Sequence, residues 1–166
     1  MLFPDEHELI HRIALALIRR KERLGTAESC TGGLIAAACT ELPGSSQWFE
    51  RGLVSYTNQA KTELLGVPPG VIETFGAVSG EVAGHMARGL MAHAPVEWAI
   101  AVTGIAGPTG GSSAKPVGTV WLAMAHDGKL LRVWQEHFEG DRHDVRLATV
   151  RVALSALCEA VEDRDY

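Results

Sequence analysis

Hydrophobic and polar positions recur with a helical period at the start of the chain. In residues 5–24, the apolar positions that share one helix face are Leu9, Ile10, Ile13, Leu17 and Leu24. The segment closes with RRKER, where positive charge favours the C-terminus of a helix. The sequence therefore predicts an amphipathic helix that ends at Gly25.

Several later segments have the shorter period or the composition of β-strands. WAIAV, residues 98–102, is a continuous apolar run, typical of a strand that is buried on both faces. The segments VGTVWLAMA and KLLRVWQEHF flank HDG, which predicts two strands joined by a tight hairpin. The short stretch TAE and residues 49–57 complete the predicted strands.

Helices are predicted between these strands. They cover LIAAACTEL up to Pro43 and Gly44, residues 58–65 before a Pro-Pro-Gly turn, residues 80–93, and a last helix that GDRHD caps and that runs to about Val161. Helices alternating with strands, plus one hairpin, predict an α/β fold, a three-layer α/β/α sandwich with a mixed sheet. With 166 residues, of which 46% are hydrophobic, we expect a single domain over residues 1–166.

Composition narrows the range of partners. The 15 Lys and Arg against 20 Asp and Glu give a net charge of -5, which argues against nucleic acid but allows a small phosphorylated ligand. A basic leader and an apolar run of membrane-spanning length are both missing, so we expect a soluble, cytoplasmic protein with no membrane partner. The three cysteines have no Cys-x-x-Cys spacing and predict neither a disulfide framework nor a structural zinc site.

The stretch HELIH matches His-Glu-x-x-His, which can place two imidazoles on one helix face for zinc. The remaining histidines are scattered and indicate no third ligand. We interpret His7 and His11 as part of a solvated helix face, and a zinc hydrolase centred on them is the alternative.

The stretch TAESCTGG lies where a predicted strand gives way to a helix. Gly32 and Gly33 cost stability in a first helical turn, which indicates that a ligand approaches the backbone or that amides stay open. Amides of Cys30, Thr31 and the two glycines could bind a phosphate or the oxyanion of an acyl-transfer intermediate. Ser29 is a candidate nucleophile, and Cys30 competes because a thiol beside a helix N-terminus can have a lowered pKa. The alternative is structural, with Ser29 as a helix cap.

A serine nucleophile needs a base, and the histidines offer no obvious partner. In SYTNQAK, Tyr56 ends a predicted strand and Lys61 lies one short turn later. A desolvated lysine can have its pKa depressed enough to act as a neutral general base, and a tyrosine could pass a proton or orient the amine. Taken alone, such a lysine is typical of surface charge.

Two further segments are candidates for substrate contacts. TGIAGPTGG follows the predicted central strand, and ligands collect beyond the carboxyl ends of such strands, so Thr103, Gly104 and Gly107 could contact a phosphate, a ribose or an amide. The alternative is a flexible connecting loop. Arg142, in the first turn of the last helix, could hold a phosphate or form an ion pair with neighbouring carboxylates.

Four motifs in this order, AESCTGGLIA, SYTNQAK, AVTGIAGPTGG followed by KPVGTVW, and FEGDRHDVR, closely resemble the C-terminal domain of the CinA (competence/damage-inducible) family. That domain is known as the nicotinamide mononucleotide deamidase, and the chain resembles its stand-alone form over about residues 7–160. The resemblance implies hydrolysis of the carboxamide of nicotinamide mononucleotide to nicotinate mononucleotide and ammonia, in pyridine-nucleotide salvage. It also implies a homodimer or higher homo-oligomer.

The resemblance assigns roles to individual residues. Ser29 matches the nucleophile, Lys61 matches the lysine that activates it, and Tyr56 assists. Thr103 and the loop after it match positions that line the site.

An arginine near the substrate is also implied, for which Arg142 is the choice and Arg146 the alternative. Amide hydrolysis of this kind calls for no metal or cofactor, since the serine turn and the lysine supply the nucleophile, the oxyanion donors and the proton. The competing interpretation is a nucleotide-binding regulatory module without turnover, which uses the same turn and glycine loop to hold phosphate.

Overall fold

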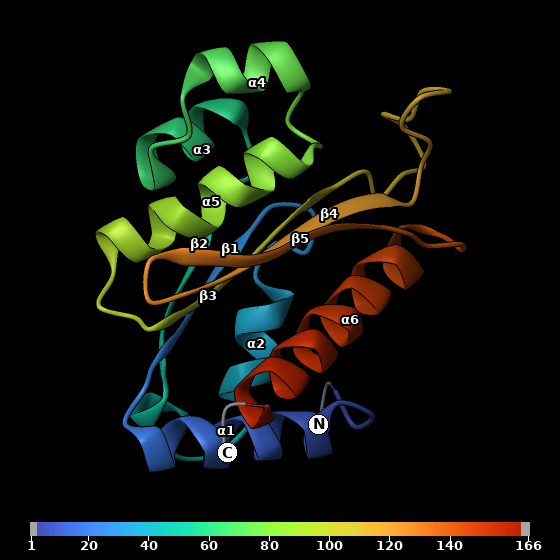
Figure 1. Ribbon diagram of the computed structural model, residues 1–166. Coiled ribbons are helices and arrows are strands. Elements are labelled where there is room, and N and C mark those ends of the chain that lie inside the picture. The colour runs from blue at the N-terminus through green and yellow to red at the C-terminus, as the bar shows by residue number, and fades with distance from the viewer. Residues whose placement is uncertain (1–2, 164–166) are drawn as a thin grey trace.

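The computed structural model describes residues 3–163, which form a five-stranded sheet between two layers of helices (Figure 1). The strands are β1 Leu24–Glu28, β2 Phe49–Val54, β3 Trp98–Gly104, β4 Thr119–His126 and β5 Lys129–His137. Their order in the sheet is β2-β1-β3-β4-β5. β1 is parallel to β2 and β3, whereas β4 is antiparallel to β3 and β5. The predicted mixed sheet is confirmed.

The helices cover both faces of the sheet (Figure 1). They are α1 His7–Arg20, α2 Leu34–Thr40, the 3-10 helix η1 Ser45–Gln47, α3 Asn58–Leu65, α4 Pro69–Phe75, α5 Gly80–His93 and α6 Arg142–Glu162. Helices α1, α2 and α6 pack on one face of the sheet, and α3, α4 and α5 form the layer on the other. The three-layer α/β/α sandwich predicted from the sequence is therefore confirmed.

The apolar run of β3 follows from its central position in the sheet, between the two helix layers. Ile100 and Val102 belong to the core under α1, α2 and α6, whereas Ala99 and Ala101 belong to the core under α5. Successive side chains of a strand point to opposite faces, so a strand covered on both sides is apolar at every position.

The first predicted helix is too long. α1 ends at Arg20, Lys21 adopts a left-handed conformation with φ 56°, and Leu24 and Gly25 lie in β1. Leu24 is fully buried and pairs with both neighbouring strands, so its apolar side chain serves the sheet rather than the helix face.

Helix α4 was missed, because Pro68, Pro69 and Gly70 predicted only a turn. Pro68 is in fact the N-cap of α4 and Pro69 its first residue. Proline suits this position, since its fixed φ is helical and its missing N–H would have had no partner. The second strand is also shorter than predicted, because Thr57 leaves it to cap α3, where its side chain accepts a hydrogen bond from Ala60 N.

Two predicted turns are confirmed by their backbone. Asp127 and Gly128 both have positive φ, 47° and 79°, as a two-residue hairpin between β4 and β5 requires. At the start of α6, Asp141 Oδ1 accepts hydrogen bonds from the amides of His143 and Asp144, and the Asp144 carboxylate accepts one from Asp141 N. This capping box fixes the start of α6.

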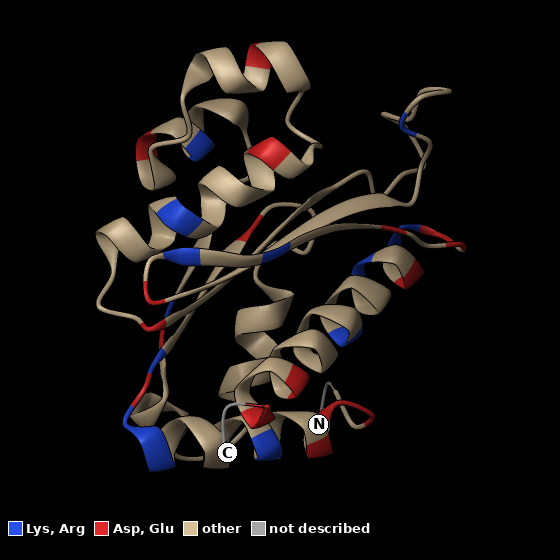
Figure 2. Cartoon of the chain, in the orientation of Figure 1, with Lys and Arg blue, Asp and Glu red and all other residues tan. Residues whose placement is uncertain are grey.

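Charged residues are unevenly distributed over the sheet, since β1, β2 and β5 each carry at least one. β3 and β4 contain no Lys, Arg, Asp or Glu, and charges of both signs are interspersed over the helices and loops (Figure 2). Within residues 3–163, none of the helices has the length and apolar character needed to cross a membrane.

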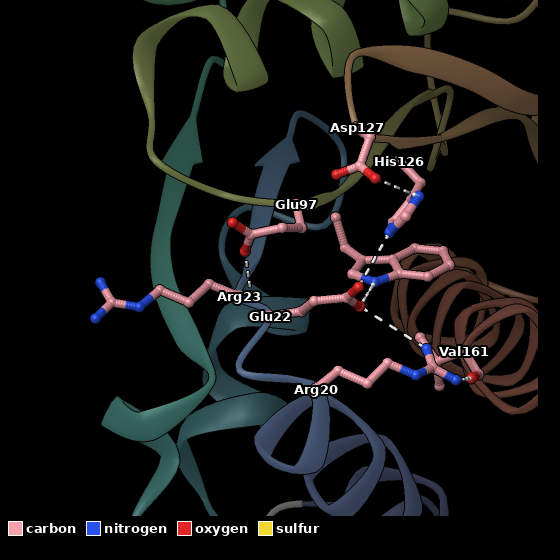
Figure 3. Close-up of polar contacts among 8 residues, drawn as sticks. Arg20, Glu22, Arg23, Glu97, His126, Asp127 and Val161 are labelled. Carbon is pink, nitrogen blue, oxygen red and sulfur yellow. Dashed lines mark hydrogen bonds and ion pairs between the residues drawn. The ribbon is translucent and has the colours of Figure 1, made fainter. Parts of the chain in front are cut away.

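A polar cluster joins four elements where β1 and β3 begin (Figure 3). This amino-edge cluster consists of Arg20, Glu22, Trp98, His126 and the carbonyl of Val161. Glu22 accepts a hydrogen bond of 2.7 Å from Trp98 Nε1, and its carboxylate lies 3.5 Å from His126 Nε2 and 3.8 Å from Arg20 Nη1. Arg20 also donates to the carbonyl of Val161 in α6. The opposite, carboxyl edge of the sheet is left for the candidate site.

Candidate functional site

The parallel strands bring the serine turn and the lysine segment to one edge of the sheet. Ser29 directly follows β1, and its amide donates to Val102 O of β3 at 3.1 Å. Ser55 directly follows β2, and its amide donates to Glu28 O of β1 at 2.9 Å. Ligand sites of open α/β sheets form at such carboxyl ends.

Lys61 contacts Ser29 at this edge. Lys61 Nζ lies 3.0 Å from Ser29 Oγ, 3.0 Å from Ser55 O and 3.3 Å from Tyr56 O. Its side chain is buried, with 1% exposure, so the alternative of a surface charge is wrong. Thr57 begins α3 immediately after β2, and Lys61 therefore lies in its first turn and reaches back over the strand end.

Burial lowers the pKa of the Lys61 amine, and the neighbouring Cys30 opposes this shift. A neutral amine has two N–H groups, which can donate hydrogen bonds to the carbonyls of Ser55 and Tyr56. Its lone pair then remains for the hydroxyl proton of Ser29. The contact has the geometry of a nucleophile and its general base.

Cys30 is a poorer nucleophile than its position at the turn predicted. Its side chain is buried, and burial raises the pKa of the thiol to about 11, with a further rise from the charge of Glu28. The thiolate is the reactive form of cysteine and is therefore scarce near neutral pH. Of the two candidates, the surroundings favour Ser29.

The two glycines shape the turn between β1 and α2. Gly32 and Gly33 have φ 59° and 98°, in the left-handed region that side chains disfavour, and Gly33 is the N-cap of α2. The Gly32 amide donates to Ser29 O at 3.0 Å, so it is occupied within the turn. Among the described residues, no backbone oxygen accepts from the amides of Cys30, Thr31 or Gly33. The amides of Cys30 and Thr31 approach the Cys30 sulfur, where they oppose the rise of the thiol pKa, and they remain as candidate oxyanion donors.

Glu28 is a functional candidate that the sequence reasoning missed. Its side chain is 1% exposed, and its carboxylate accepts hydrogen bonds from Thr26 Oγ1, Thr31 Oγ1, Ile35 N and Ala36 N. The signal in the sequence was a single acidic residue at the end of an apolar strand.

Arg142 reaches the site from the first turn of α6. It donates to Tyr56 Oη at 2.6 Å and to Gly107 O at 2.9 Å. Within residues 3–163, it forms these bonds rather than the predicted ion pair with the acidic residues beside it. The Tyr56 ring is half exposed, so its hydroxyl and the guanidinium lie at the mouth of the site.

Arg146 has a different position from Arg142. Its Nε donates to Cys30 O at 3.1 Å and its Nη2 to Thr31 O at 3.0 Å. Arg146 therefore holds the backbone of the serine turn, whereas Arg142 is placed at the mouth.

Two cavities meet at Arg142. The smaller, about 190 Å³, is called the reaction pocket here; its lining includes Ser29, Cys30, Tyr56, Lys61, Thr103, Gly104, Ala106 and Arg142. The larger, about 630 Å³, is called the outer pocket; its lining includes Ala106, Pro108, Val117, Asp141, Arg142, His143 and Arg146. Because Ala106 and Arg142 line both, the cavities are neighbours.

The glycine loop forms one wall of the reaction pocket. Thr103 is buried and its hydroxyl donates to Ala77 O at 2.8 Å. A Cβ on Gly104 would lie 2.7 Å from a Val120 methyl group and 3.1 Å from Cys30 Sγ, so only glycine fits there. Gly107 contributes its carbonyl to Arg142.

The His-Glu-x-x-His stretch, for which a zinc site was only the alternative interpretation, lies outside the reaction pocket. His7 and His11 are exposed on α1, and neither side chain lines the reaction pocket that contains Ser29. Within residues 3–163, no group of three or more His, Cys, Asp or Glu side chains is placed to hold a metal ion.

A buried lysine on a serine hydroxyl, at the carboxyl edge of a mixed sheet, defines an α/β protein with a candidate serine–lysine pair. Residues 6–161 match the CinA C-terminal domain, and the chain belongs to this family.

Relatives cover nearly all of the chain. Nicotinamide-nucleotide amidohydrolase PncC of Enterobacter agglomerans is 49% identical over 95% of this chain and 96% of its own length. The CinA-like protein of Geotalea daltonii is 50% identical over 94% of this chain but only 38% of its own length. The crystal structure of competence damage-inducible protein A (ComA) from Klebsiella pneumoniae has a TM-score of 0.91 and 39% identity, covering 96% of this chain and 98% of that chain.

Proposed function

We propose that the protein is a nicotinamide-nucleotide amidohydrolase of the cytoplasm that converts nicotinamide mononucleotide to nicotinate mononucleotide and ammonia, with Ser29 as nucleophile. The observation that carries the proposal is the 3.0 Å contact between the Lys61 amine and the Ser29 hydroxyl in a buried pocket. The name of the Enterobacter agglomerans relative supports the substrate. Pyridine-nucleotide salvage is the pathway that such a reaction serves.

In the first half of the reaction, neutral Lys61 takes the hydroxyl proton of Ser29 while Ser29 Oγ attacks the carboxamide carbon. The amides of Cys30 and Thr31 donate to the oxyanion of the tetrahedral intermediate. The Lys61 ammonium returns a proton to the amide nitrogen, the C–N bond breaks and ammonia leaves. An ester of Ser29 with the nicotinate group remains.

In the second half, water replaces ammonia. Lys61, neutral again, takes a proton from the water, whose oxygen attacks the ester carbon. The second tetrahedral intermediate uses the same two amides. Breaking of the bond to Ser29 Oγ, with return of the proton from Lys61, releases nicotinate mononucleotide and restores the hydroxyl.

The two cavities match the two halves of the substrate. Small-molecule sites are typically about 300–1,000 Å³, so a reaction pocket of about 190 Å³ suits the pyridine carboxamide alone. The outer pocket of about 630 Å³ then takes the ribose and phosphate. The amides of His143 and Asp144 at the start of α6 are occupied by Asp141, so a phosphate there relies on side chains of the outer pocket. Arg142 is our choice, because Arg146 already holds the carbonyls of the serine turn.

Ammonia release from nicotinamide mononucleotide, measured with a metal chelator present, tests this proposal on wild type and Ser29→Ala. We expect wild-type turnover that the variant loses by roughly 10³-fold or more. Near-normal turnover in Ser29→Ala would remove Ser29 as nucleophile. A wild-type protein that binds the nucleotide without releasing ammonia would establish the regulatory module instead.

A further inference from the structure

The buried carboxylate of Glu28 lies directly beneath the turn that carries Ser29. We propose that Glu28 is a positioning residue, which fixes Ser29 relative to Lys61 and to the oxyanion amides. The inference rests on the proposed amidohydrolase function and deepens it. It concerns a residue that does not line the reaction pocket.

Glu28 joins the strand to the helix across the turn. Its Oε1 accepts from Thr31 Oγ1 at 2.6 Å and from Ile35 N at 2.9 Å. Its Oε2 accepts from Ala36 N at 2.9 Å and from Thr26 Oγ1 at 3.1 Å. The backbone of Glu28 is held in the sheet by Ser55 N, so the carboxylate fixes the first turn of α2 relative to β1.

All four partners of the carboxylate are donors. An ionised carboxylate has only acceptors and can satisfy all of them at once, whereas an amide, in either orientation, would place its own N–H groups against one of the two backbone amides. The two backbone amides begin α2, where negative charge is favoured. A buried charge in this position is stable only because it is hydrogen-bonded on both oxygens.

Arg146 holds the same turn on its other side. It binds the carbonyls of Cys30 and Thr31. Because the peptide unit is planar and trans, the N–H of Thr31 points opposite to the carbonyl of Cys30. Glu28 and Arg146 thus fix the turn through its donors and its acceptors, respectively, which sets the direction of the candidate oxyanion donors.

Such positioning affects rate more than binding. Catalytic groups must be held within about 0.5 Å of productive geometry, and a displacement of about 1 Å can cost about 100-fold in rate. Ser29 directly follows Glu28 in the chain. Loss of the carboxylate therefore moves the nucleophile and its oxyanion donors without touching the substrate.

The test compares Glu28→Gln with Glu22→Gln. We expect Glu28→Gln to lower kcat about 100-fold with KM changed less than about threefold. Glu22 is the matched control, because its carboxylate also joins several elements but lies in the amino-edge cluster (Figure 3). Glu22→Gln should lower Tm and leave kcat close to the wild-type value.

A milder variant keeps the test decisive if Glu28→Gln fails to fold. Thr26→Val removes one donor to Glu28 Oε2 with little change of shape. We expect a fall in kcat of several-fold, again without a matching change in KM. The proposal is overturned if folded Glu28→Gln has an unchanged kcat, or loses no more activity than its unfolded fraction explains. If Glu28→Gln does not fold, an unchanged kcat in Thr26→Val overturns it.

A second readout does not depend on nicotinamide mononucleotide. Methanesulfonyl fluoride reacts with an activated serine, in which the Oγ–S bond forms, the S–F bond breaks, and Lys61 takes the proton. Slower labelling of Ser29 in folded Glu28→Gln supports the inference even if wild type releases no ammonia, in which case only the proposed function fails. Wild-type protein that neither releases ammonia nor is labelled overturns both.

Discussion

Lys61 shows how its surroundings can suit one residue to a role that its type alone does not indicate. Lysine is usually a surface residue, but here α3 begins so soon after β2 that the side chain must cross the buried strand end. Desolvation lowers its pKa, and two carbonyls orient the amine toward Ser29. Burial disfavours the charged form of Lys61 and so favours the neutral amine that the proposed role as general base requires.

The pH dependence of turnover follows from this lowered pKa. Only the neutral amine accepts a proton, so kcat/KM should rise with pH through the pKa of Lys61 in the folded protein, which lies below that of an ordinary lysine. Lys61→Arg keeps the positive charge but cannot lose its proton in this range, and we expect it to lose about 10³-fold or more in kcat. A pH profile with the same rising limb in Lys61→Arg would contradict the assignment.

The position of Arg142 predicts an effect on binding of the phosphate. Arg142→Ala should raise KM for nicotinamide mononucleotide about 10- to 100-fold, since a hydrogen bond to a charged group contributes about 1.5–3 kcal/mol. The nucleoside without phosphate should be little affected, and comparing the two substrates by steady-state kinetics is the measurement. Equal losses for both substrates would place Arg142 away from the phosphate.

For single residues, the sequence predicted which residues belong to the candidate site but not all of the contacts between them. The resemblance pointed to Ser29 and Lys61, and the structure brings them within 3.0 Å. The resemblance did not settle whether Arg142 or Arg146 lies near the substrate, because the two residues share one helix face. Only their partners distinguish them: Arg142 binds the carbonyl of Gly107, and Arg146 binds the carbonyl of Cys30. Glu28 was overlooked because the groups that donate hydrogen bonds to its carboxylate lie up to eight positions away in the chain. A short sequence motif does not reveal such contacts.

Helices α3 and α5 approach each other closely at Gly89. A Cβ on Gly89 of α5 would lie 1.7 Å from Leu65 O at the end of α3, so the two helices contact through backbone. The position of α3 against α5 is therefore set by a glycine, and α3 carries Lys61.

Gly89→Ala should destabilise the protein by about 3 kcal/mol or more, because a backbone carbonyl cannot move aside as a side chain can. Denaturant unfolding measures the change. Gly70→Ala in α4 is the matched control, since a Cβ there meets no atom within 4 Å, and it should be neutral or stabilising by up to about 1 kcal/mol. Equal stability of the two variants would contradict the close approach.

Element prediction succeeded where local chemistry decides and failed where packing does. The hairpin at Asp127 and Gly128 and the cap at Asp141 are local, and both were correct. Leu24 was assigned to a helix because its apolar side chain continues the helical spacing of the preceding residues. In the structure the same side chain is buried by the sheet. Pro68 and Pro69 fit a turn and a helix start equally well by local chemistry, and α4 buries Ile72 against the core, which the local sequence does not show.

For the whole molecule, alternation of helices and strands was enough to predict the mixed sandwich. The family match over residues 6–161 agrees with the extent of the predicted resemblance. A single domain over residues 1–166 and a homo-oligomer stay predictions.

The oligomeric state can be measured directly. We expect light scattering of the purified protein to give at least twice the monomer mass of 17.8 kDa. A single species at the monomer mass across working concentrations would be the contrary result.

The placement of α1 and α6 has a practical consequence for handling the protein. His7 and Glu162 lie at the helix ends that gather away from the carboxyl edge of the sheet, and Arg12 binds Glu162 there (Figure 1). Affinity tags, surface tethers or reporter proteins joined to the chain before α1 or after α6 would leave the cavities accessible. Immobilised or genetically fused versions should therefore keep the reaction rate of the free protein.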